Sequence, residues 1–398
     1  MEQKYLHKWG ILILVTLLNM VAPLSTDMYM PALPIIASDY NVSASAVDAT
    51  MYAYTICTAV GILILSPISD KYGRKKILLS SLAIYGFGSF TCTTAPNIEI
   101  MIVCRVLQAI GGGGMSAIAI AIIKDCFAGK TRGVALSVVQ SMFVVGPILA
   151  PIIGAWVLTF ASWRAIFIVQ GLFSIIMIIL ALFYIESIPK DEIHTGKITH
   201  TYKQIFIIAK NKNFITYLLM GSCYFAPFMG YLALSSFVYQ DVFHLSPQEF
   251  SMFFAINGLV SIVGPLACIY FSKKDHKMGV QTGYLIIGAI CTIMVFIIGN
   301  ISAVAFLLCI IPYNITTSFQ RPFVTDILLE QHDGDTGSAS ALINFVYTIF
   351  GGIGMIVASA PWGDFVFAYG ITCAIFISAA VILWVYICKS KSIKLKGM

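Results

Sequence analysis

Long apolar segments recur along the whole of this chain, and each is close to the length that crosses a lipid bilayer. A spanning helix needs about 20 apolar residues, and a chain of 398 residues has room for a dozen of them with short connections. Only 11% of the residues are charged, against roughly 25% in a soluble protein. The pattern therefore predicts an all-α membrane protein, and runs of this length exclude the alternating ten-residue segments of an outer-membrane barrel.

Twelve transmembrane helices can be placed on the sequence. We expect them at residues 11–34, 46–67, 77–95, 98–123, 133–159, 164–186, 213–240, 248–271, 279–299, 301–322, 338–361 and 364–388. The one long polar break, 187–212, separates an N-terminal half, 1–186, from a C-terminal half, 213–398. This layout predicts two six-helix bundles joined by a cytoplasmic central loop, as in secondary transporters whose substrate site lies near the midplane between two halves.

Lysine and arginine residues gather on one side of this layout. Of the 24 basic residues, all but Arg105 and Arg164 fall in the N-terminal segment, in alternate connections or in the tail, with Arg321 placed at the end of the tenth span. Basic loops remain in the cytoplasm, so we expect both termini there, in a multi-pass protein of the cell (inner or plasma) membrane. The net charge of +6 is spread over these loops and does not indicate nucleic acid binding.

Asp27 is the only acid that the sequence places well inside a predicted span. A charged side chain in hydrocarbon costs at least about 2.5–3.5 kcal/mol and is functional by default. We therefore interpret Asp27 as a proton-exchange site. Arg105, inside the fourth span, likewise needs a partner or a water-filled cavity.

Asp27 and Arg105 are expected at the same depth in the membrane. Each lies seven residues from the outer end of its span, Asp27 before Pro34 and Arg105 after Ile98, which is roughly 10 Å at 1.5 Å per residue. The two charges could therefore form a coupled pair, directly or through water. The alternative is that Arg105 faces other helices and bonds to backbone carbonyls.

Three segments have the spacing of known transporter motifs. Residues 66–76, Ser-Pro-Ile-Ser-Asp-Lys-Tyr-Gly-Arg-Lys-Lys, resemble motif A of the major facilitator superfamily, with Ser66 in place of its first glycine. Residues 105–109, Arg-Val-Leu-Gln-Ala, resemble motif B, with Ala109 in place of a glycine. Residues 146–155 resemble the antiporter motif C in degraded form, and a plain proline kink is the alternative there.

The stretch Leu24–Pro34 closely resembles the first-helix signature of the drug:proton antiporters. With the motifs above, the chain resembles the bicyclomycin and chloramphenicol resistance (Bcr/CflA) branch over nearly its whole length. The resemblance implies the twelve-helix major facilitator fold and a cytoplasmic gate in which Gly73 forms a turn, Asp70 meets the start of span eleven and Arg74 pairs with Asp125. The antiporter-motif helix would be formed around Gly146, Pro147, Pro151 and Gly154.

Aromatic and amide side chains within the spans are candidates for a substrate cavity, because drug-sized ligands bind in largely apolar pockets with a few polar groups. Packing in the core or toward lipid is the alternative for each ring. The candidates are Asn19, Tyr29, Tyr54, Gln108, Gln140, Tyr231, Asn257, Asn314 and Asn344. Some related exporters have a second acid eight residues before the aspartate, where this chain has Asn19, so we expect one membrane carboxylate.

These features predict proton-coupled efflux of small lipophilic drugs by alternating access, by a monomer in the lipid bilayer with the proton as coupling ion and no cofactor. Another facilitator substrate, such as an amino acid, a sugar or a siderophore, is the alternative. A purely anionic substrate would favour several basic residues in the cavity, and only Arg105 is expected there. We expect neither an enzyme nor a catalytic or metal site, since the chain has no G-x-S-x-G, H-E-x-x-H or C-x-x-C pattern.

Overall fold

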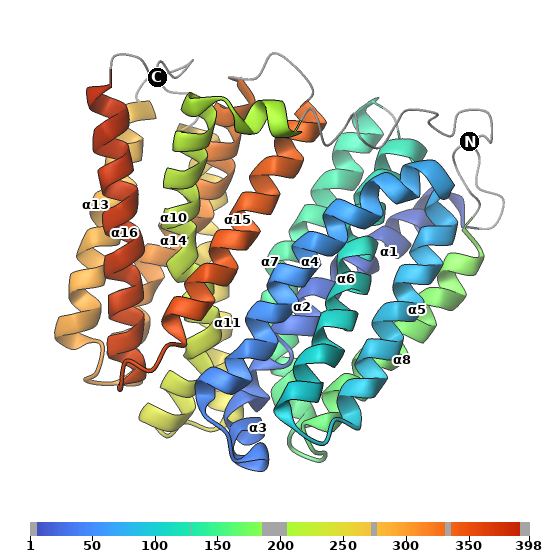
Figure 1. The fold of residues 1–398 in the computed structure, drawn as a ribbon, viewed down its shortest axis with the longest axis horizontal. Helices are drawn as coiled ribbons and strands as arrows, with labels where there is room; N and C mark the ends of the chain where they lie inside the picture. The colour runs from blue at the N-terminus through green and yellow to red at the C-terminus, as the bar shows by residue number, and fades with distance from the viewer. Residues whose placement is uncertain (1–5, 128, 185–204, 272–276, 331–335, 391–398) are drawn as a thin grey trace. The chain divides into compact units, whose positions relative to one another are not determined.

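The computed structural model describes residues 6–127, 129–184, 205–271, 277–330 and 336–390 (Figure 1). Within these ranges the regular structure is helical and contains no strand. Ten helices of the described part are long and apolar enough to cross a membrane, so the predicted all-α membrane protein is confirmed. The chain divides into two compact units, Met1–Ile198 and Thr199–Met398, and this division falls inside the predicted loop 187–212.

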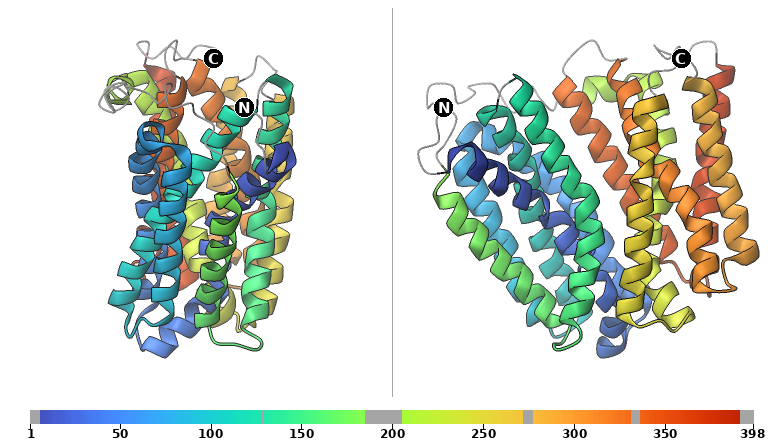
Figure 2. Two further views of the ribbon diagram at one scale, coloured as in Figure 1. Left: turned by 90° about the vertical axis from the view of Figure 1, so that its right-hand side faces the viewer. Right: turned by 180° about the vertical axis from the view of Figure 1, so that it is seen from behind.

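Unit 1, Met1–Ile198, is built around the helix α6. Its helices are α1 (His7–Asn19), α2 (Val21–Thr26), η1 (Met30–Ala32), α3 (Leu33–Tyr40), α4 (Ala44–Tyr72), α5 (Arg74–Thr93), α6 (Ile98–Cys126), α7 (Gly129–Val157) and α8 (Arg164–Leu182). α6 packs against α4 and α5, and α5 packs against α8 (Figure 1). Seen from behind, α1 lies between α7 and α8 (Figure 2).

Unit 2, Thr199–Met398, is organised around the helix α10. Its helices are α10 (Lys212–Phe237), the π-helical turn η3 (Val238–Val242), α11 (Pro247–Ser261), α12 (Val263–Phe271), α13 (Lys277–Ile298), α14 (Ala303–Glu330), α15 (Thr336–Ala358) and α16 (Phe365–Lys389). α10 packs against α14, α15 and α16 (Figure 1). The predicted central loop falls mostly outside the described residues.

Local side chains set where several helices begin. The Ser43 hydroxyl accepts a hydrogen bond from the backbone at the start of α4, and the Asn97 side chain does the same for α6. At α11, Ser246 and Glu249 form a reciprocal capping box. These side chains pair backbone N–H groups that a helix leaves without an internal partner.

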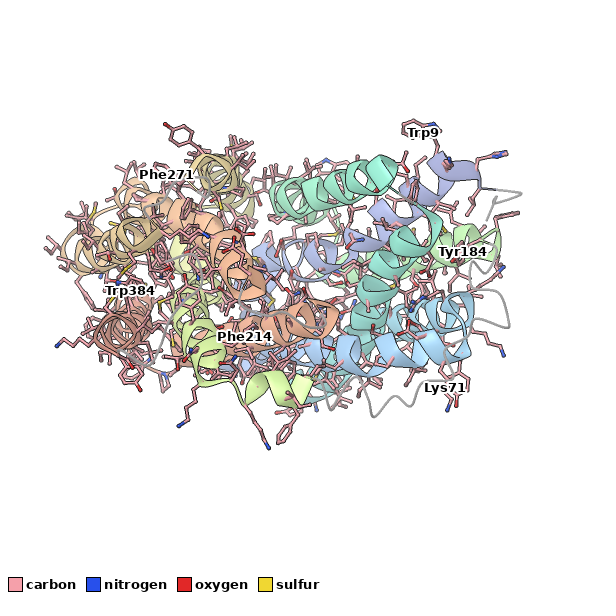
Figure 3. The ribbon with its side chains drawn as sticks, turned by 90° about the horizontal axis from the view of Figure 1, so that it is seen from above. Trp9, Lys71, Tyr184, Phe214, Phe271 and Trp384 are labelled. Atoms are coloured by element: carbon pink, nitrogen blue, oxygen red, sulfur yellow. The ribbon has the colours of Figure 1, made fainter. Side chains whose placement is uncertain are left out.

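Large apolar side chains remain exposed on many of the helices. Trp9, which is 77% exposed, points away from the helices of unit 1 when the molecule is seen from above, as does Lys71 (Figure 3). Contact with lipid favours exposed apolar side chains of this kind, whereas contact with water opposes an apolar surface of this extent.

The first predicted span is broken rather than continuous. We expected one helix at 11–34, whereas α1, α2, η1 and α3 follow one another from His7 to Tyr40. Pro23 lies in α2, Pro31 in η1 and Pro34 at the start of α3. Proline has no N–H to donate and clashes with the preceding turn, so three prolines in twelve residues interrupt the helix around Asp27.

The glycines of α6 allow its neighbours to approach closely. A Cβ added at Gly111 would lie 2.6 Å from the Ser81 carbonyl oxygen on α5, and one added at Gly113 would collide with the Thr58 carbonyl oxygen on α4. On α5, Gly88 meets the backbone of Gln108 in the same way. Close approach across small residues is typical of membrane helix packing, and here it brings α6 against α4 and α5.

α14 is longer than the tenth span predicted from the sequence. That span was expected at 301–322 with Arg321 at its end, whereas α14 continues to Glu330 and places Arg321 nine residues before its last residue. This distance is about 13 Å along the helix. The prediction ended the span at the first charged residue, but the apolar packing continues, since Ile327 and Leu328 are fully buried.

Two of the predicted spans are helices in the structure but are not among the ten that are long and apolar enough to cross a membrane. The span predicted at 77–95 corresponds to α5, whose first turn carries three basic residues. The span predicted at 133–159 corresponds to α7, which has a shorter apolar stretch at Val145–Val157.

Candidate functional site

Asp27 lies in the gap between α2 and η1. Asp27 is 5% exposed, and its carboxylate accepts a hydrogen bond from the Thr26 hydroxyl at 2.8 Å. The N–H groups of Asp27 and Met28 both turn back to the carbonyl of Pro23, at 2.8 and 3.2 Å. The break therefore holds an acid inside unit 1 with one hydrogen-bond donor beside it among the described residues.

The glycines of the antiporter-motif helix lie directly against this break. α7 packs against α1, α2 and η1. A Cβ at Gly154 would collide with the carbonyl oxygen of Met28, and a Cβ at Gly146 would lie 2.5 Å from the ring of Pro23. Only a residue without a side chain lets the α7 backbone approach the Asp27 turn this closely. The prolines of the motif lie on α7 between these glycines, at Pro147 and Pro151.

Arg105 is fully buried on α6 and surrounded by aromatic rings. The Cζ atom of its guanidinium lies 4.3 Å from the ring centroid of Tyr54 and 5.1 Å from that of Tyr29. Its Nη1 donates a hydrogen bond to Oε1 of Gln108 at 2.6 Å. Ring faces and an amide oxygen thus stabilise the buried cation, and no carboxylate of the described ranges forms an ion pair with it.

The predicted direct pair of Asp27 and Arg105 is not formed. The ion pairs of the described residues do not include it. Equal depth places two residues in one layer, but it does not fix the direction in which each side chain leaves its helix. The Nε and Nη2 atoms of Arg105 have no hydrogen-bond partner in the described part of the chain, and pairing through water stays a prediction.

A chain of buried amides connects Arg105 with the backbone beside Asp27. Gln108 accepts from Arg105, and its Nε2 donates to Oε1 of Gln170 on α8 at 2.7 Å. Nε2 of Gln170 in turn donates to the carbonyl oxygen of Leu24 at 2.7 Å. The helix break frees this carbonyl, because the Met28 N–H bonds to Pro23 instead. We call the path Arg105–Gln108–Gln170–Leu24 the amide relay.

Sequence reasoning did not identify Gln170. Its signal in the sequence was the single amide of the span 164–186, since an unpaired polar group inside a span would cost free energy. The hydroxyl of Ser89, on α5, is a second unpredicted contact, since it accepts from Nε2 of Gln108 at 2.8 Å.

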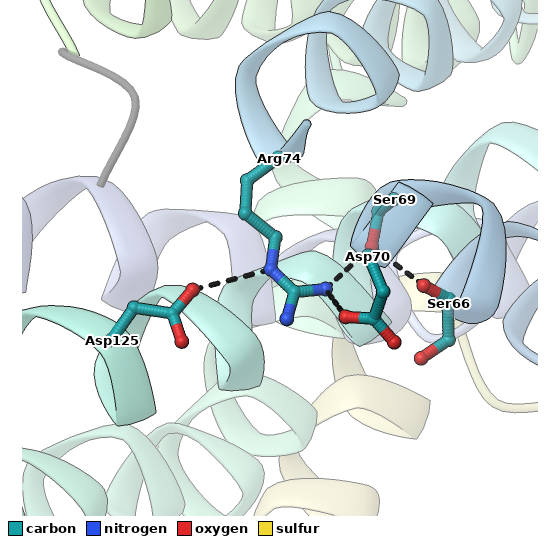
Figure 4. A network of polar contacts seen from close by, with 5 residues as sticks. All are labelled: Ser66, Ser69, Asp70, Arg74 and Asp125. Atoms are coloured by element: carbon teal, nitrogen blue, oxygen red, sulfur yellow. Dashed lines mark hydrogen bonds and ion pairs between the residues drawn. The ribbon is translucent and has the colours of Figure 1, made fainter. Parts of the chain in front are cut away.

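The motif A residues form a compact ionic cluster at the ends of α4, α5 and α6. Figure 4 shows Arg74 between two carboxylates: it forms an ion pair with Asp70, and its Nε lies 3.2 Å from Oδ2 of Asp125. Nη1 of Arg74 also donates to the Ser69 hydroxyl at 2.7 Å. Gly73 makes the turn between α4 and α5 with φ of 98°, a value that favours glycine. The predicted Arg74–Asp125 pair is confirmed, and the contact of Asp70 with span eleven stays a prediction.

Unit 2 contains a counterpart of this cluster. Nζ of Lys277, the first residue of α13, lies 2.9 Å from Oε2 of Glu330, the last residue of α14. In unit 1, Arg74 opens α5 and Asp125 lies one residue before the end of α6. Each unit therefore ties the start of one long helix to the end of the next through an ion pair.

The remaining candidates of unit 1 lie in different settings. The Tyr29 hydroxyl is 3.1 Å from the Thr50 hydroxyl, beside Arg105. Asn19 donates to the carbonyl of Val15 on its own helix at 2.9 Å. The side chain of Gln140, on α7, lies outside the described part of the structure.

In unit 2, Tyr231 and Asn257 are buried, and Tyr231 stacks on Phe254 with ring centroids 6.0 Å apart. Asn314 is fully buried on α14, and its amide has no hydrogen-bond partner among the described residues. Asn344 is exposed on α15 and accepts from Arg321 at 3.4 Å. The structure thus brings Tyr29, Tyr54 and Gln108 to Arg105. The three amides of unit 2 lie on three different helices, α11, α14 and α15.

Comparison with known families agrees with this arrangement. Residues 15–355 match the family described as Major Facilitator Superfamily. The chain belongs to this superfamily. Proteins of this family are membrane transporters, so the chain is a transporter and not an enzyme.

Individual relatives of this facilitator support the same assignment. The uncharacterized MFS-type transporter YdgK of Bacillus subtilis (strain 168) is 30% identical over 348 residues, 85% of this chain and 86% of that protein. The bicyclomycin resistance protein homolog of Haemophilus influenzae is 26% identical over 267 residues, 67% of this chain and 66% of that protein. The predicted relationship to the Bcr/CflA branch is confirmed.

A solved structure shows the fold of the facilitator. The crystal structure of a D-xylose-proton symporter superposes with a TM-score of 0.73 and 16% identity, over 98% of each chain. The chain therefore has the major facilitator fold.

Proposed function

We propose that this facilitator exports small lipophilic drugs in exchange for protons, with twelve transmembrane helices in two six-helix bundles. The transporter would work as a monomer in the cell membrane with both termini in the cytoplasm. The observation that carries the proposal is Asp27, a buried carboxylate in a helix break against the antiporter-motif helix. The name of the Haemophilus influenzae relative, a bicyclomycin resistance protein homolog, supports a drug as the substrate class.

The proton cycle follows from the position of Asp27. In the outward-facing state Asp27 takes a proton, which removes a charge that is costly to bury. In the inward-facing state it releases the proton to the cytoplasm, and substrate binds. One proton entering per cycle gains about 2.3 kcal/mol per 100 mV of membrane potential, in addition to the pH gradient.

The amide relay supplies a physical link between the proton site and the cavity. Arg105 borders Tyr29 and Tyr54, two candidate substrate residues. The other end of the relay holds the Leu24 carbonyl, three residues before Asp27. A movement of the Asp27 turn on protonation would therefore reach Gln170 and Gln108 first and the Arg105 guanidinium next. A shift of the Arg105 guanidinium would change its contacts with a substrate bound near the two tyrosine rings.

The ionic cluster of motif A serves as the cytoplasmic gate in this proposal. Arg74 contacts Asp70 and Asp125, so it ties the ends of three helices together. Opening on the cytoplasmic side would require the cluster to rearrange. The free energy of its ion pairs would therefore set how readily the transporter leaves the state in which this side is closed.

Drug export is tested by a susceptibility panel in a host that lacks its own pumps. Cells that express the wild-type chain should tolerate higher concentrations of some lipophilic antibiotics than cells with the empty vector. Asp27→Asn should abolish this protection at equal membrane abundance. Asp39→Asn is the matched control, because Asp39 lies in the same first segment but its side chain is 47% exposed and it pairs with Arg164. Absence of protection against every compound by the wild type would contradict the proposed function.

A further inference from the structure

Arg321 lies nine residues before the end of the membrane-length helix α14, and the function proposed above does not use it. α14 spans Ala303–Glu330, and the side chain of Arg321 is exposed nine residues before its end. An arginine within a transmembrane helix almost always faces the protein interior or a water-filled cavity, and it marks a substrate or ion pathway by default.

The helices α10, α14 and α15 pack against one another (Figure 1), and the guanidinium of Arg321 on α14 contacts the other two. Its Cζ atom is 5.3 Å from the ring centroid of Phe225 on α10 and 5.8 Å from that of Tyr347 on α15. Its Nη2 donates to Oδ1 of Asn344 at 3.4 Å. Asn344 is itself fixed, since its Nδ2 donates to the Ser340 carbonyl at 3.0 Å.

The surroundings of Arg321 are held rigidly. The rings of Phe225 and Tyr347 contact each other at 5.4 Å in an edge-to-face arrangement. The Tyr347 hydroxyl accepts from Nε2 of Gln320 at 2.9 Å. Gly221 leaves the room for this pair, because a Cβ there would lie 2.6 Å from both of its polar atoms. The three helices therefore present a cation and two rings in one fixed geometry.

Among the described residues, Arg321 has no acidic partner. The contacts it makes are to rings and one amide oxygen. Arg105 differs in being fully buried, so its guanidinium is closed in by protein, whereas the exposed Arg321 keeps donors free for a ligand. A guanidinium with available N–H donors can bind a carboxylate through two parallel hydrogen bonds.

We propose that Arg321, Asn344, Phe225 and Tyr347 form a subsite for the acidic group of an amphipathic substrate, whose apolar or aromatic part packs against the two rings. The proposal rests on the export function proposed above and names a substrate class for it: lipophilic compounds that carry a carboxylate or a similar anion. If Arg321 binds substrate in this way, Arg105 is not the only cation available to a substrate. Export of an anion and entry of a proton move charge in the same direction, so the membrane potential would drive both.

The test is a binding measurement with two probes that share a dansyl group and differ in their terminal group, a carboxylate or a neutral amide. The full-length protein in phosphatidylcholine nanodiscs is titrated with dansylglycine, which carries a carboxylate, and with dansylglycinamide, which is neutral. The fluorescence of the dansyl group reports binding. The wild type should bind the carboxylate about tenfold more tightly than the amide, the effect of one charge-assisted hydrogen bond. Arg321→Gln should bind the two probes equally, and Arg321→Lys should retain part of the preference.

Two controls make the result specific to the subsite. Arg164→Gln removes a basic residue that pairs with Asp39 in unit 1 and should leave the preference intact. Wild-type protein in nanodiscs that contain phosphatidylglycerol should also retain it, whereas loss of the preference there would assign the subsite to an anionic lipid headgroup and overturn the proposal.

The proposal is overturned if the wild type does not prefer the carboxylate, or if Arg321→Gln keeps the wild-type preference. A folded Arg321→Gln protein is recognised by unchanged binding of the neutral probe. The measurement uses no proton gradient, so its failure bears on the subsite alone, whereas failure of the susceptibility panel bears on drug export.

Discussion

Removal of Gln170 from the amide relay should uncouple export from the proton gradient without unfolding the protein. Gln170→Leu keeps a side chain of similar size and removes two interhelical hydrogen bonds, one from Gln108 and one to the Leu24 carbonyl, both at 2.7 Å. Hydrogen bonds between membrane helices contribute on average about 0.6 kcal/mol and at most about 1.7 kcal/mol each. The total loss is therefore about 1–3 kcal/mol, which a large transporter tolerates.

The consequence for coupling is larger than the loss of stability suggests. Without Gln170, the Leu24 carbonyl has no donor and the turn that carries Asp27 is no longer tied to Gln108 and Arg105. A change of 1.4 kcal/mol in the relative free energy of two transporter states changes their ratio tenfold. We expect uptake driven by a pH gradient into everted vesicles to fall about tenfold, with drug binding to the purified protein changed less than about twofold.

The matched control is Ser174→Ala on the same helix. The Ser174 hydroxyl donates to the Leu82 carbonyl at 2.7 Å and is buried like Gln170, but it does not belong to the relay. This variant should lower the melting temperature of the purified protein slightly and leave the ratio of proton-driven uptake to binding unchanged. The reasoning is refuted if Gln170→Leu and Ser174→Ala give the same ratio.

Three further outcomes are expected. Arg74→Ala and Asp125→Asn should each reach the membrane but export less than a tenth as much as the wild type, because Arg74 ties three helix ends together. Full export by both variants would contradict the role of this cluster as a gate. Gly154→Val should abolish export through its collision with the Met28 carbonyl, while Gly279→Ala, which meets no atom within 4 Å, should be silent; an active Gly154→Val would contradict the close approach of α7. Export of a neutral compound by the wild type should respond to membrane potential at a fixed pH gradient, since one proton enters per cycle, and indifference to potential in proteoliposomes would contradict that stoichiometry.

Contacts of residues that stand in a recognisable motif could be predicted from the sequence. The resemblance to motif A implies the Arg74–Asp125 pair, and Gly73 predicts the turn; both are confirmed. The run of small residues in α6 predicts close helix packing, which Gly111 shows directly. In both cases the motif contains one side of a contact between two helices.

Features that depend on direction around a helix could not be predicted. Asp27 and Arg105 were placed at one depth, but rotation about each helix axis decides which side chains meet, and Arg105 meets Tyr54 instead. Gln170 is a single amide in an apolar helix, and its partners lie on α6 and α2, far away in sequence. The position of Arg321 was missed because hydropathy falls at a charged residue whether or not the helix ends there.

The central claim is that Asp27 is the group that takes up and releases the coupling proton. Its most direct test is Asp27→Asn in proteoliposomes, with a drug identified in the susceptibility panel and an imposed pH gradient. The variant should exchange labelled for unlabelled drug across the membrane, because this exchange needs no net proton movement, but it should not accumulate drug against a concentration gradient. Wild type and Asp39→Asn should accumulate it. Uphill transport by Asp27→Asn under the same gradient would show that the proton site lies elsewhere in the chain.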